Sequence, residues 1–374
     1  MSDKAILTAD PGASYRALKE EIDAAIRSVL DGPGYILGEA VSRFETDFAR
    51  YVGVQHGVGV NNGTDAIHLA LRALDIGPGD EVIAVSHTAV ATVAAIGMVG
   101  AVPVLADVHP TTRTIDPAAV GALITPRTKA VIAVHLYGRP ADVDALLLLC
   151  EKHGLALVED CAQAHAARWK GTMVGSFGRL ATFSFYPTKN LGAIGDAGMI
   201  VTRDAALAAK LKLLRQYGWE KPQYSIMEGW NSRMDPLQAA ILSVKLRHLD
   251  DHTARRRELA QRYNEVLKGL PIGLPIEGEN CTHVYHLYVI ELQDGVTRDA
   301  LRTYLAERGI MAGIHYEYGV HEQPAYRDRI RTGTMAVTER LARTVLSLPL
   351  YPELTDVDQR RVSDAVRSFF AQRK

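Results

Sequence analysis

Three segments of the sequence carry side chains that could act together on one ligand, and the first holds Lys189. This lysine follows the strand-like run 181–185 and a turn with Pro187, and glycines come soon after it. The pattern is typical of a single amine held at a strand end, with backbone free to approach a ligand. An amine kept neutral by desolvation or by nearby positive charge can form an imine with an aldehyde. Ser184, in the same run, can point its hydroxyl at a phosphate.

The second segment supplies a carboxylate. Asp160 ends the apolar run 155–160, and an acid at that place can accept a charge-assisted hydrogen bond from a protonated ring nitrogen. Taken alone, a strand-end acid is more often the cap of the following turn. Gln163 and His165 follow within reach of the same pocket, although each alone is more often a satisfied polar residue.

The third segment is 61–65, between a predicted strand and a predicted helix, and it contains Gly63 and Thr64. Backbone amides at a helix N-terminus, a glycine that allows close approach and a hydroxyl together suit a phosphate. An ordinary capped helix start would have the same pattern. The three segments together, however, meet the requirements of pyridoxal phosphate, which needs a phosphate site, an acid for its ring nitrogen and an imine-forming lysine. The sequence therefore predicts a pyridoxal phosphate enzyme.

Alternating strand and helix patterns must bring these segments together. Short Val- and Ile-rich runs predict seven strands, at 57–60, 82–85, 102–105, 130–135, 155–159, 181–185 and 199–202. Helical periods lie between several of them, for example at 64–74. The alternation predicts an α/β fold with a mostly parallel seven-stranded sheet flanked by helices. Ligands of such sheets bind at the carboxyl ends of the strands, where the three segments fall.

A long helix is predicted after the sheet. Asp235 suits the N-cap, Pro236 the first helical position, and Gln238 the third position after the cap. We expect this helix to run through Leu249 and to meet another that starts near His252. Farther on, the patterns predict strands at 285–292 and 310–315 and helices at 297–308, 336–347 and 355–372, and a helix is expected within the first thirty residues, packed on one of the domains.

The length of 374 residues suits one large domain and one smaller domain. We expect a large α/β domain at 1–250, including the N-terminal helix, and a small α+β domain at 251–374. The formal charge is −1, and no basic run is interleaved with aromatic residues, so nucleic acid is not an expected partner. The uncharged stretch 82–106 is long enough to span a membrane, but it divides into a strand, an alanine-rich helix and a second strand.

Cysteine usage and the N-terminus favour the cytoplasm. The sequence has three cysteines without a CxxC pair, which indicates a reducing compartment and no structural metal. The first residues lack the basic-then-apolar order of a signal peptide. Cys161, beside Asp160, has no convincing base partner, so a catalytic thiol is the weaker interpretation.

At this point the sequence resembles the nucleotide-sugar aminotransferases of the DegT/DnrJ/EryC1/StrS family, which belong to the fold type I group of aspartate aminotransferase. The resemblance covers nearly the whole chain. It rests on sequence blocks in the family's order, at 63–66, 79–82, 100–104, 126–129, 134–138, 159–165, 184–190, 231–233 and 348–350.

The resemblance implies a role for each candidate residue. Lys189 holds the cofactor as an imine and then moves a proton between cofactor and sugar, while Asp160 keeps the ring nitrogen protonated. Asn231 is expected to reach the phosphate of the neighbouring subunit's cofactor, which implies a homodimer with shared sites. The expected cofactor-binding residues are Gly63, Thr64, Asp160, Gln163, His165, Ser184, Lys189 and Asn231, and the candidates for substrate contact are Tyr186, Arg233, His315 and Tyr316.

The resemblance also implies two half-reactions, in which L-glutamate donates an amino group and a nucleotide-linked keto-sugar receives it. The run 185–193 is most similar to members that aminate C3 of a dTDP-3-keto-6-deoxyhexose. The alternatives are a C4 aminotransferase of a dTDP-, UDP- or GDP-4-keto-6-deoxyhexose, a keto-cyclitol aminotransferase, and a regulatory protein on the same fold. Lys189 argues against the dehydratases of the family, which lack this lysine. A nicotinamide dehydrogenase is disfavoured because no G-x-G-x-x-G follows a strand.

Three positions depart from the family pattern. Ala89 stands where an aromatic residue commonly stacks on the cofactor, which leaves His87 as the candidate for that role. Ala166 and Ala197 stand where the family usually has glycine. None of the three departures removes a catalytic group.

Overall fold

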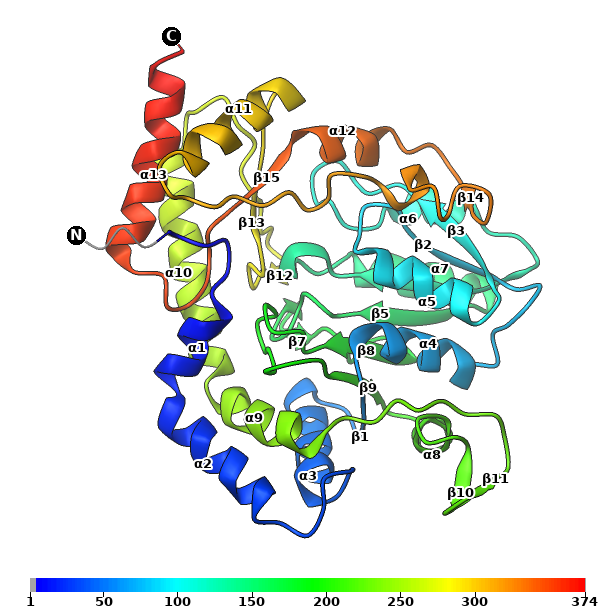
Figure 1. Cartoon of the computed structure of the whole chain (residues 1–374). Coiled ribbons are helices and arrows are strands. Elements are labelled where there is room, and N and C mark those ends of the chain that lie inside the picture. The colour runs from blue at the N-terminus through cyan, green and yellow to red at the C-terminus, as the bar shows by residue number, and fades with distance from the viewer. Residues whose placement is uncertain (1–4, 374) are drawn as a thin grey trace.

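A sheet of eight strands forms the centre of the molecule in the computed structural model, which describes residues 5–373 (Figure 1). In spatial order the strands are β1 (His56–Val60), β9 (Gly198–Thr202), β8 (Leu180–Ser184), β5 (Ala156–Asp160), β4 (Thr128–Val134), β2 (Glu81–Val85), β3 (Val102–Ala106) and β14 (Arg331–Thr332). The pairings from β8 to β14 are parallel, and β9 runs antiparallel to both of its neighbours. The seven predicted strands and the mostly parallel α/β fold are confirmed. The eighth strand, β14, was not predicted.

The strands are apolar because helices cover both faces of the sheet. The helices of this region are α3 (Glu39–Val52), α4 (Gly63–Ala73), α5 (Val90–Met98), α6 (Pro117–Gly121), α7 (Val143–His153) and α8 (Ala205–Leu214). Alternate residues of one strand enter different hydrophobic clusters, as the strand period of two requires. In β9, Met199 and Val201 belong to the cluster that contains Phe44 and Phe48, whereas Ile200 belongs to the other. The stretch 82–106 is therefore a strand, a helix and a strand buried in this core.

The N-terminal segment forms two short helices, α1 (Pro11–Ala17) and α2 (Lys19–Leu30), drawn in dark blue in Figure 1. The buried Ile22 of α2 packs against Ile241 and Val244, which belong to helix α9. The expected helical segment among the first thirty residues is thus confirmed, and it packs on the helix that follows the sheet.

Helix α9 (Pro236–Arg247) starts where the sequence predicts but is capped differently. Pro236 occupies the first turn, yet the Asp235 side chain makes no capping hydrogen bond. The Gln238 amide instead bonds to both backbone groups of Ile194, accepting from its N–H and donating to its carbonyl, each at 2.9 Å. Gln238 therefore fastens a loop from another part of the chain. The next helix, α10 (Leu249–Leu267), begins almost immediately, so α9 is shorter than predicted.

The C-terminal part contains a two-stranded antiparallel sheet, β13 (Tyr288–Glu291) with β15 (Val345–Leu348), and the helices α11 (Gly295–Ala306), α12 (Ala336–Thr344) and α13 (Asp356–Ala371). Two expectations were wrong. The segment 310–315 makes only isolated bridges, from Ile310 to Ile6 and from Gly313 to Ser347. The predicted helix at 336–347 ends at Thr344 and continues as β15, because residues 345–348 pair with β13.

Short elements complete the description of residues 5–373: η1 (Leu136–Gly138), β6 (Arg168–Trp169), β7 (Thr172–Met173), β10 (Trp219–Lys221), β11 (Tyr224–Ser225), β12 (Cys281–Thr282) and η2 (Val320–Glu322). Strand β6 pairs with β12 on one side and with β7 on the other, and β10 pairs with β11. None of the helices in this part of the chain combines the length and the apolar character that crossing a membrane requires.

Candidate active site

Asp160 is the last residue of β5, and its side chain lies at the carboxyl end of the parallel strands. It is only 5% exposed. The Thr92 hydroxyl donates to Oδ2 at 2.8 Å, and the Ala162 backbone N–H donates to Oδ1 at 3.1 Å. A carboxylate can accept about four hydrogen bonds, so the carboxylate keeps acceptor capacity for a ligand.

Lys189 lies in the loop that leaves β8, near Asp160. The loop folds back on itself, because the Lys189 N–H donates to the Tyr186 carbonyl at 2.8 Å and the Ala193 N–H to the Phe185 carbonyl at 2.7 Å. Loss of solvent around the amine lowers the pKa of Lys189 from 10.5 to about 8, although the negative charge of Asp160 opposes this shift. A useful fraction of the amine is therefore neutral near neutral pH, as imine formation requires.

The start of α4 and the end of β8 form one cradle. The Asn62 side chain caps α4 by accepting from the Asp65 N–H at 2.8 Å. Gly63 lies so close to Ser184 that an added Cβ would be 2.5 Å from the Ser184 Cβ. Only glycine permits this approach, which brings the unpaired amides of the first helical turn and the Thr64 residue beside the Ser184 hydroxyl. This arrangement suits an anion such as a phosphate.

The Gln163 side chain connects the turn after β4 with the C-terminal part of the chain through two hydrogen bonds. Its Oε1 accepts from the Tyr137 N–H at 2.7 Å, and its Nε2 donates to the Tyr316 Oη at 2.9 Å. The Tyr137 hydroxyl donates to the His315 carbonyl, and the His315 ring bonds to the Ser347 hydroxyl at 2.8 Å. The structure therefore places Gln163, His315 and Tyr316 in one connected group at the strand ends.

Tyr137 is a site residue that the sequence reasoning missed. It is buried, and it adopts the left-handed backbone conformation with a φ of 60°, which is rare for a tyrosine. Backbone strain of this kind concentrates at functional sites. In the sequence, the block 134–138 stands out only through its family resemblance, and no local signal separates this tyrosine from a core residue. Thr92, within an apolar helix, was missed for the same reason.

His165 lies behind Lys189 in an aromatic environment. Its ring centroid is 5.4 Å from that of Phe183, 5.6 Å from Phe185 and 6.5 Å from Phe48. By hydrogen-bond geometry neither ring nitrogen has a partner in residues 5–373, although the Ser184 backbone lies close enough to favour the protonated ring. Burial, assisted by the nearby charge of Lys189, lowers the pKa of His165 to about 3. The imidazole is therefore neutral and adds no positive charge beside the amine.

His87, the candidate for stacking on the cofactor, is fully buried and bonds through Nε2 to the Tyr137 hydroxyl at 2.7 Å. Burial lowers the pKa of His87 to about 3, so this ring is neutral as well. Its plane is nearly perpendicular to that of Tyr316, with the centroids 6.2 Å apart. A stacking role for His87 stays a prediction.

Asn231, Arg233 and Tyr186 lie toward the surface. Tyr186 is 53% exposed, and the Arg233 guanidinium lies 5.8 Å from the ring centre of Tyr217. Asn231 is exposed beside the buried Ser232, whose hydroxyl accepts from the backbone N–H of the segment that leads into α4. Within residues 5–373 none of the three has a recorded side-chain contact with Lys189 or Asp160, so they do not form one group within a single subunit.

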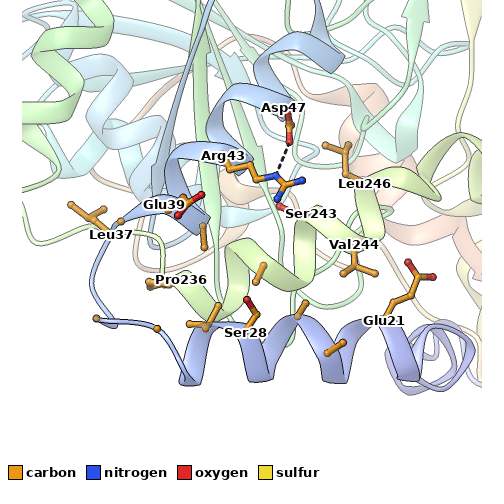
Figure 2. Close-up of a pocket in the computed structure, with 18 of the residues that line it drawn as sticks. Glu21, Ser28, Leu37, Glu39, Arg43, Asp47, Pro236, Ser243, Val244 and Leu246 are labelled. Atoms are coloured by element: carbon orange, nitrogen blue, oxygen red, sulfur yellow. Dashed lines mark ion pairs between the residues drawn. The ribbon is translucent and has the colours of Figure 1, made fainter.

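A larger cavity lies elsewhere. A groove of about 900 Å³ lies between α2, α3 and α9. Its lining includes Glu21, Ser28, Arg43 and Ser243, which are labelled in Figure 2. No candidate site residue lines this groove. The Lys189 loop instead borders a cavity of about 30 Å³. Cavity size alone therefore does not locate the chemistry of this molecule.

Comparison with known proteins assigns the chain. The profile of the DegT/DnrJ/EryC1/StrS aminotransferase family matches residues 16–367. The "dTDP-3-amino-3,4,6-trideoxy-alpha-D-glucose transaminase" of Streptomyces venezuelae is 47% identical over 362 residues, which is 96% of this chain and 95% of the relative.

Solved structures agree. The "X-ray crystal structure of S. venezuelae DesV in complex with ketimine intermediate" superimposes with a TM-score of 0.95 at 47% identity, covering 98% of each chain. The "Crystal structure of ntda from bacillus subtilis with bound cofactor pmp" has a TM-score of 0.89 at 31% identity, covering 95% of this chain and 82% of the other. The chain belongs to the DegT/DnrJ/EryC1/StrS aminotransferase family.

Proposed function

We propose that the protein moves an amino group from L-glutamate to a nucleotide-linked keto-sugar, with pyridoxal 5′-phosphate as cofactor. The observation that carries this proposal is the lowered pKa of Lys189, about 8, in a lysine that lies near Asp160 at the strand ends. The preferred substrate is a dTDP-3-keto-6-deoxyhexose aminated at C3. The identity with the S. venezuelae transaminase over nearly the whole chain supports this choice.

The residues of the site fit the cofactor. The close approach of Gly63 to Ser184, beside the first amides of α4, supplies a cradle for the phosphate. The acceptor capacity of Asp160 suits a protonated ring nitrogen, and the Lys189 amine suits the aldehyde. When bound, the cofactor supplies an electron-accepting ring and the carbonyl that carries the amino group.

Each group of the chain then has a defined task. Lys189 Nζ would hold the cofactor through its aldehyde and would carry a proton to and from the reacting carbon. The Asp160 carboxylate would keep the ring nitrogen protonated, and a protonated ring withdraws electrons more strongly. The neutral His165 behind Lys189 avoids a second positive charge at this place. Gln163 orients Tyr316 at the edge of the site.

We further propose a cytoplasmic homodimer with shared sites, in which Asn231 reaches the phosphate of the neighbouring subunit's cofactor and Arg233 and Tyr186 contact substrate. The exposure of Asn231 and Tyr186 supports this arrangement, since both are free to meet a partner. The division into domains at 1–250 and 251–374 is part of the same proposal.

The decisive experiment compares the wild type with Lys189→Ala. The wild-type protein is expected to be yellow, to bleach when L-glutamate is added, and to recover colour when the keto-sugar follows. Lys189→Ala is expected to lose transamination by at least about a thousandfold, because both covalent attachment and proton transfer depend on this amine. Lys210→Ala, which removes a surface ion pair with Asp75, serves as the control. Wild-type turnover by Lys189→Ala would refute the proposal.

A substrate panel separates the alternatives. The 3-keto and 4-keto forms of a dTDP-6-deoxyhexose distinguish C3 from C4 amination, and UDP- and GDP-linked sugars test the nucleotide. Keto-inositols test a cyclitol aminotransferase. A protein that binds the cofactor, yet bleaches with no amino donor and aminates no acceptor in the panel, would favour the regulatory alternative.

A further inference from the structure

Helix α5 carries a buried hydroxyl that the proposed chemistry does not yet use. Thr92 is 1% exposed and lies in the first turn of the helix, among the fully buried apolar residues Val93, Ala95 and Ile96. A valine would fill the same volume without the need to satisfy a polar group. The hydroxyl therefore calls for an explanation other than packing.

The hydrogen bonds of Thr92 have a defined direction. A threonine in a helix commonly bonds back to a carbonyl three or four residues earlier, but the Thr92 Oγ1 lies 2.8 Å from the Asp160 Oδ2. A carboxylate only accepts, so the Thr92 hydroxyl donates to it. The Thr88 Oγ1 lies 3.3 Å from the Thr92 Oγ1 and is left as the donor of that contact. A directed series runs from Thr88 through Thr92 to Asp160.

The two protein contacts of Asp160 come from different elements. The Ala162 N–H holds Oδ1 from the turn that follows β5, and Thr92 holds Oδ2 from α5. A carboxylate held at one oxygen still rotates about its last side-chain bond, for which the preferences are broad. Two anchors on separate elements fix the plane of the group, and with it the direction of the remaining lone pairs.

We propose that Thr92 is a positioning residue, which fixes the carboxylate plane of Asp160 toward the ring nitrogen of the bound cofactor. Thr88 orients the Thr92 hydroxyl. This inference rests on the proposed function, because it assigns Asp160 to the ring nitrogen.

The test uses three variants of the full-length protein. Thr92→Val removes the hydroxyl and keeps the volume, while Thr92→Ser keeps the hydroxyl. Thr182→Val is the matched control, since Thr182 is also 1% exposed and its hydroxyl donates to the Glu159 backbone carbonyl rather than to Asp160. Three quantities are measured for each: the dissociation constant of pyridoxal phosphate, the pH titration of the bound-cofactor absorbance, and kcat and KM for glutamate.

Thr92→Val is expected to raise the cofactor dissociation constant and to lower kcat by about tenfold each, the ratio that loss of one hydrogen bond to a charged group produces. The pH midpoint of the absorbance is expected to move, and KM for glutamate to stay within about threefold. Thr92→Ser and Thr182→Val are expected to behave like the wild type in all three measurements.

Other results would overturn the inference. Wild-type cofactor affinity and absorbance titration in Thr92→Val would reduce Thr92 to a packing residue, and an equal loss in Thr92→Ser would assign the effect to the methyl group. The melting temperature of the cofactor-free protein shows whether Thr92→Val folds. If it does not fold, Thr92→Ser and Thr88→Val provide the test instead. Thr88→Val alone is then expected to lose about threefold in cofactor affinity and in kcat. A wild-type protein that binds no pyridoxal phosphate would refute the proposed function instead.

Discussion

Two buried acids stand side by side in β5, Glu159 and Asp160, and they are used in opposite ways. Adjacent residues of a strand point to opposite faces of a sheet. On one face, groups of the protein donate hydrogen bonds to both oxygens of the Glu159 carboxylate. Oε2 accepts from the His135 ring at 3.0 Å and from the Gly175 N–H at 2.8 Å. Oε1 accepts from the N–H groups of Phe177 and Gly178, at 2.8 and 2.7 Å. On the other face, the Asp160 carboxylate accepts two hydrogen bonds from within residues 5–373, from the Thr92 hydroxyl and the Ala162 N–H.

The difference separates an acid that stabilises the fold from one that we propose is kept for a ligand. Burial opposes ionisation of Glu159, but its bond to His135 and the backbone N–H groups of Gly175 and Gly178 outweigh burial, so the pKa of Glu159 lies below its usual value. Gly175 has a φ of +93°, and an added Cβ would be 2.7 Å from the Phe183 ring, so the loop around Glu159 is closely fitted. Burial and residue type do not distinguish the two acids, but their free acceptor capacity does.

The largest expected effect is on stability, in Glu159→Gln. An amide NH₂ would face backbone N–H donors, and the charge that they surround would be lost. We expect the free energy of unfolding of the cofactor-free protein to fall by about 3–5 kcal/mol. Denaturant unfolding followed by circular dichroism measures this change. An unfolding free energy within about 1 kcal/mol of the wild type would remove the distinction between the two acids.

Asp160→Asn is expected to show the reverse pattern. Removing the charged partner of a buried pair costs about 3–4 kcal/mol, so transamination should fall by roughly a hundred- to a thousandfold. The cofactor-free protein should lose less than about 1 kcal/mol of unfolding free energy, because few of its own contacts depend on the charge. Steady-state kinetics and denaturant unfolding of the same preparation check both parts. A large loss of stability with normal kcat would contradict the assignment.

Lys189 extends the comparison to a basic group. Burial of its amine disfavours the charged form and therefore lowers the free energy of unfolding. Its pKa in the fold, about 8, lies below the ordinary 10.5, so the unfolded chain binds more protons between these values and stability rises with pH across that window. At pH 7 we expect cofactor-free Lys189→Met to exceed the wild type in unfolding free energy by about 1–3 kcal/mol. The gain should vanish above pH 10.5, whereas a variant of the exposed Lys212 should show none. If Lys189→Met were less stable than the wild type at pH 7, burial of the Lys189 amine would not destabilise the fold.

The smallest expected effect is a shift in the pH dependence of cofactor loading. Loading requires the neutral amine, so its rate in the cofactor-free wild type should rise with a midpoint near pH 8. Because the charge of Asp160 raises the pKa of Lys189, Asp160→Asn should move the midpoint to lower pH. Stopped-flow absorbance across the pH range measures it. Thr182→Val leaves the charge of Asp160 in place and should keep the wild-type midpoint. An unmoved midpoint in Asp160→Asn would show that the charge of Asp160 does not influence the pKa of Lys189.

Local patterns were sufficient for the elements that carry the chemistry. Strand ends followed by glycine, an acid or a lysine identified the positions of Gly63, Asp160 and Lys189, because each signal is contained in a few consecutive residues. The seven strands were found for the same reason, since their apolar runs reflect burial on both faces. The roles of Asn231 and Arg233, which depend on a second subunit, stay predictions.

Features that depend on contacts between distant parts of the chain could not be read from the sequence. Thr92 and Tyr137 look like core residues until the fold brings them to Asp160 and His315. Gln238 matched a capping pattern, but a neighbouring loop takes its amide. At 345–348, an apolar run suited helix and strand alike, and pairing with β13 decided the outcome.

Strand β14 has a consequence for how the chain must be handled. Its two residues add to the outer side of β3, and the Arg331 guanidinium donates to the Leu123 carbonyl at 2.7 Å and to the buried Glu81. Until the ribosome has made this segment, part of the β3 edge has no partner, and an open, apolar strand edge invites pairing between chains. A fragment that stops before Arg331 is therefore expected to aggregate during expression, even though it contains all the segments that we propose hold the cofactor.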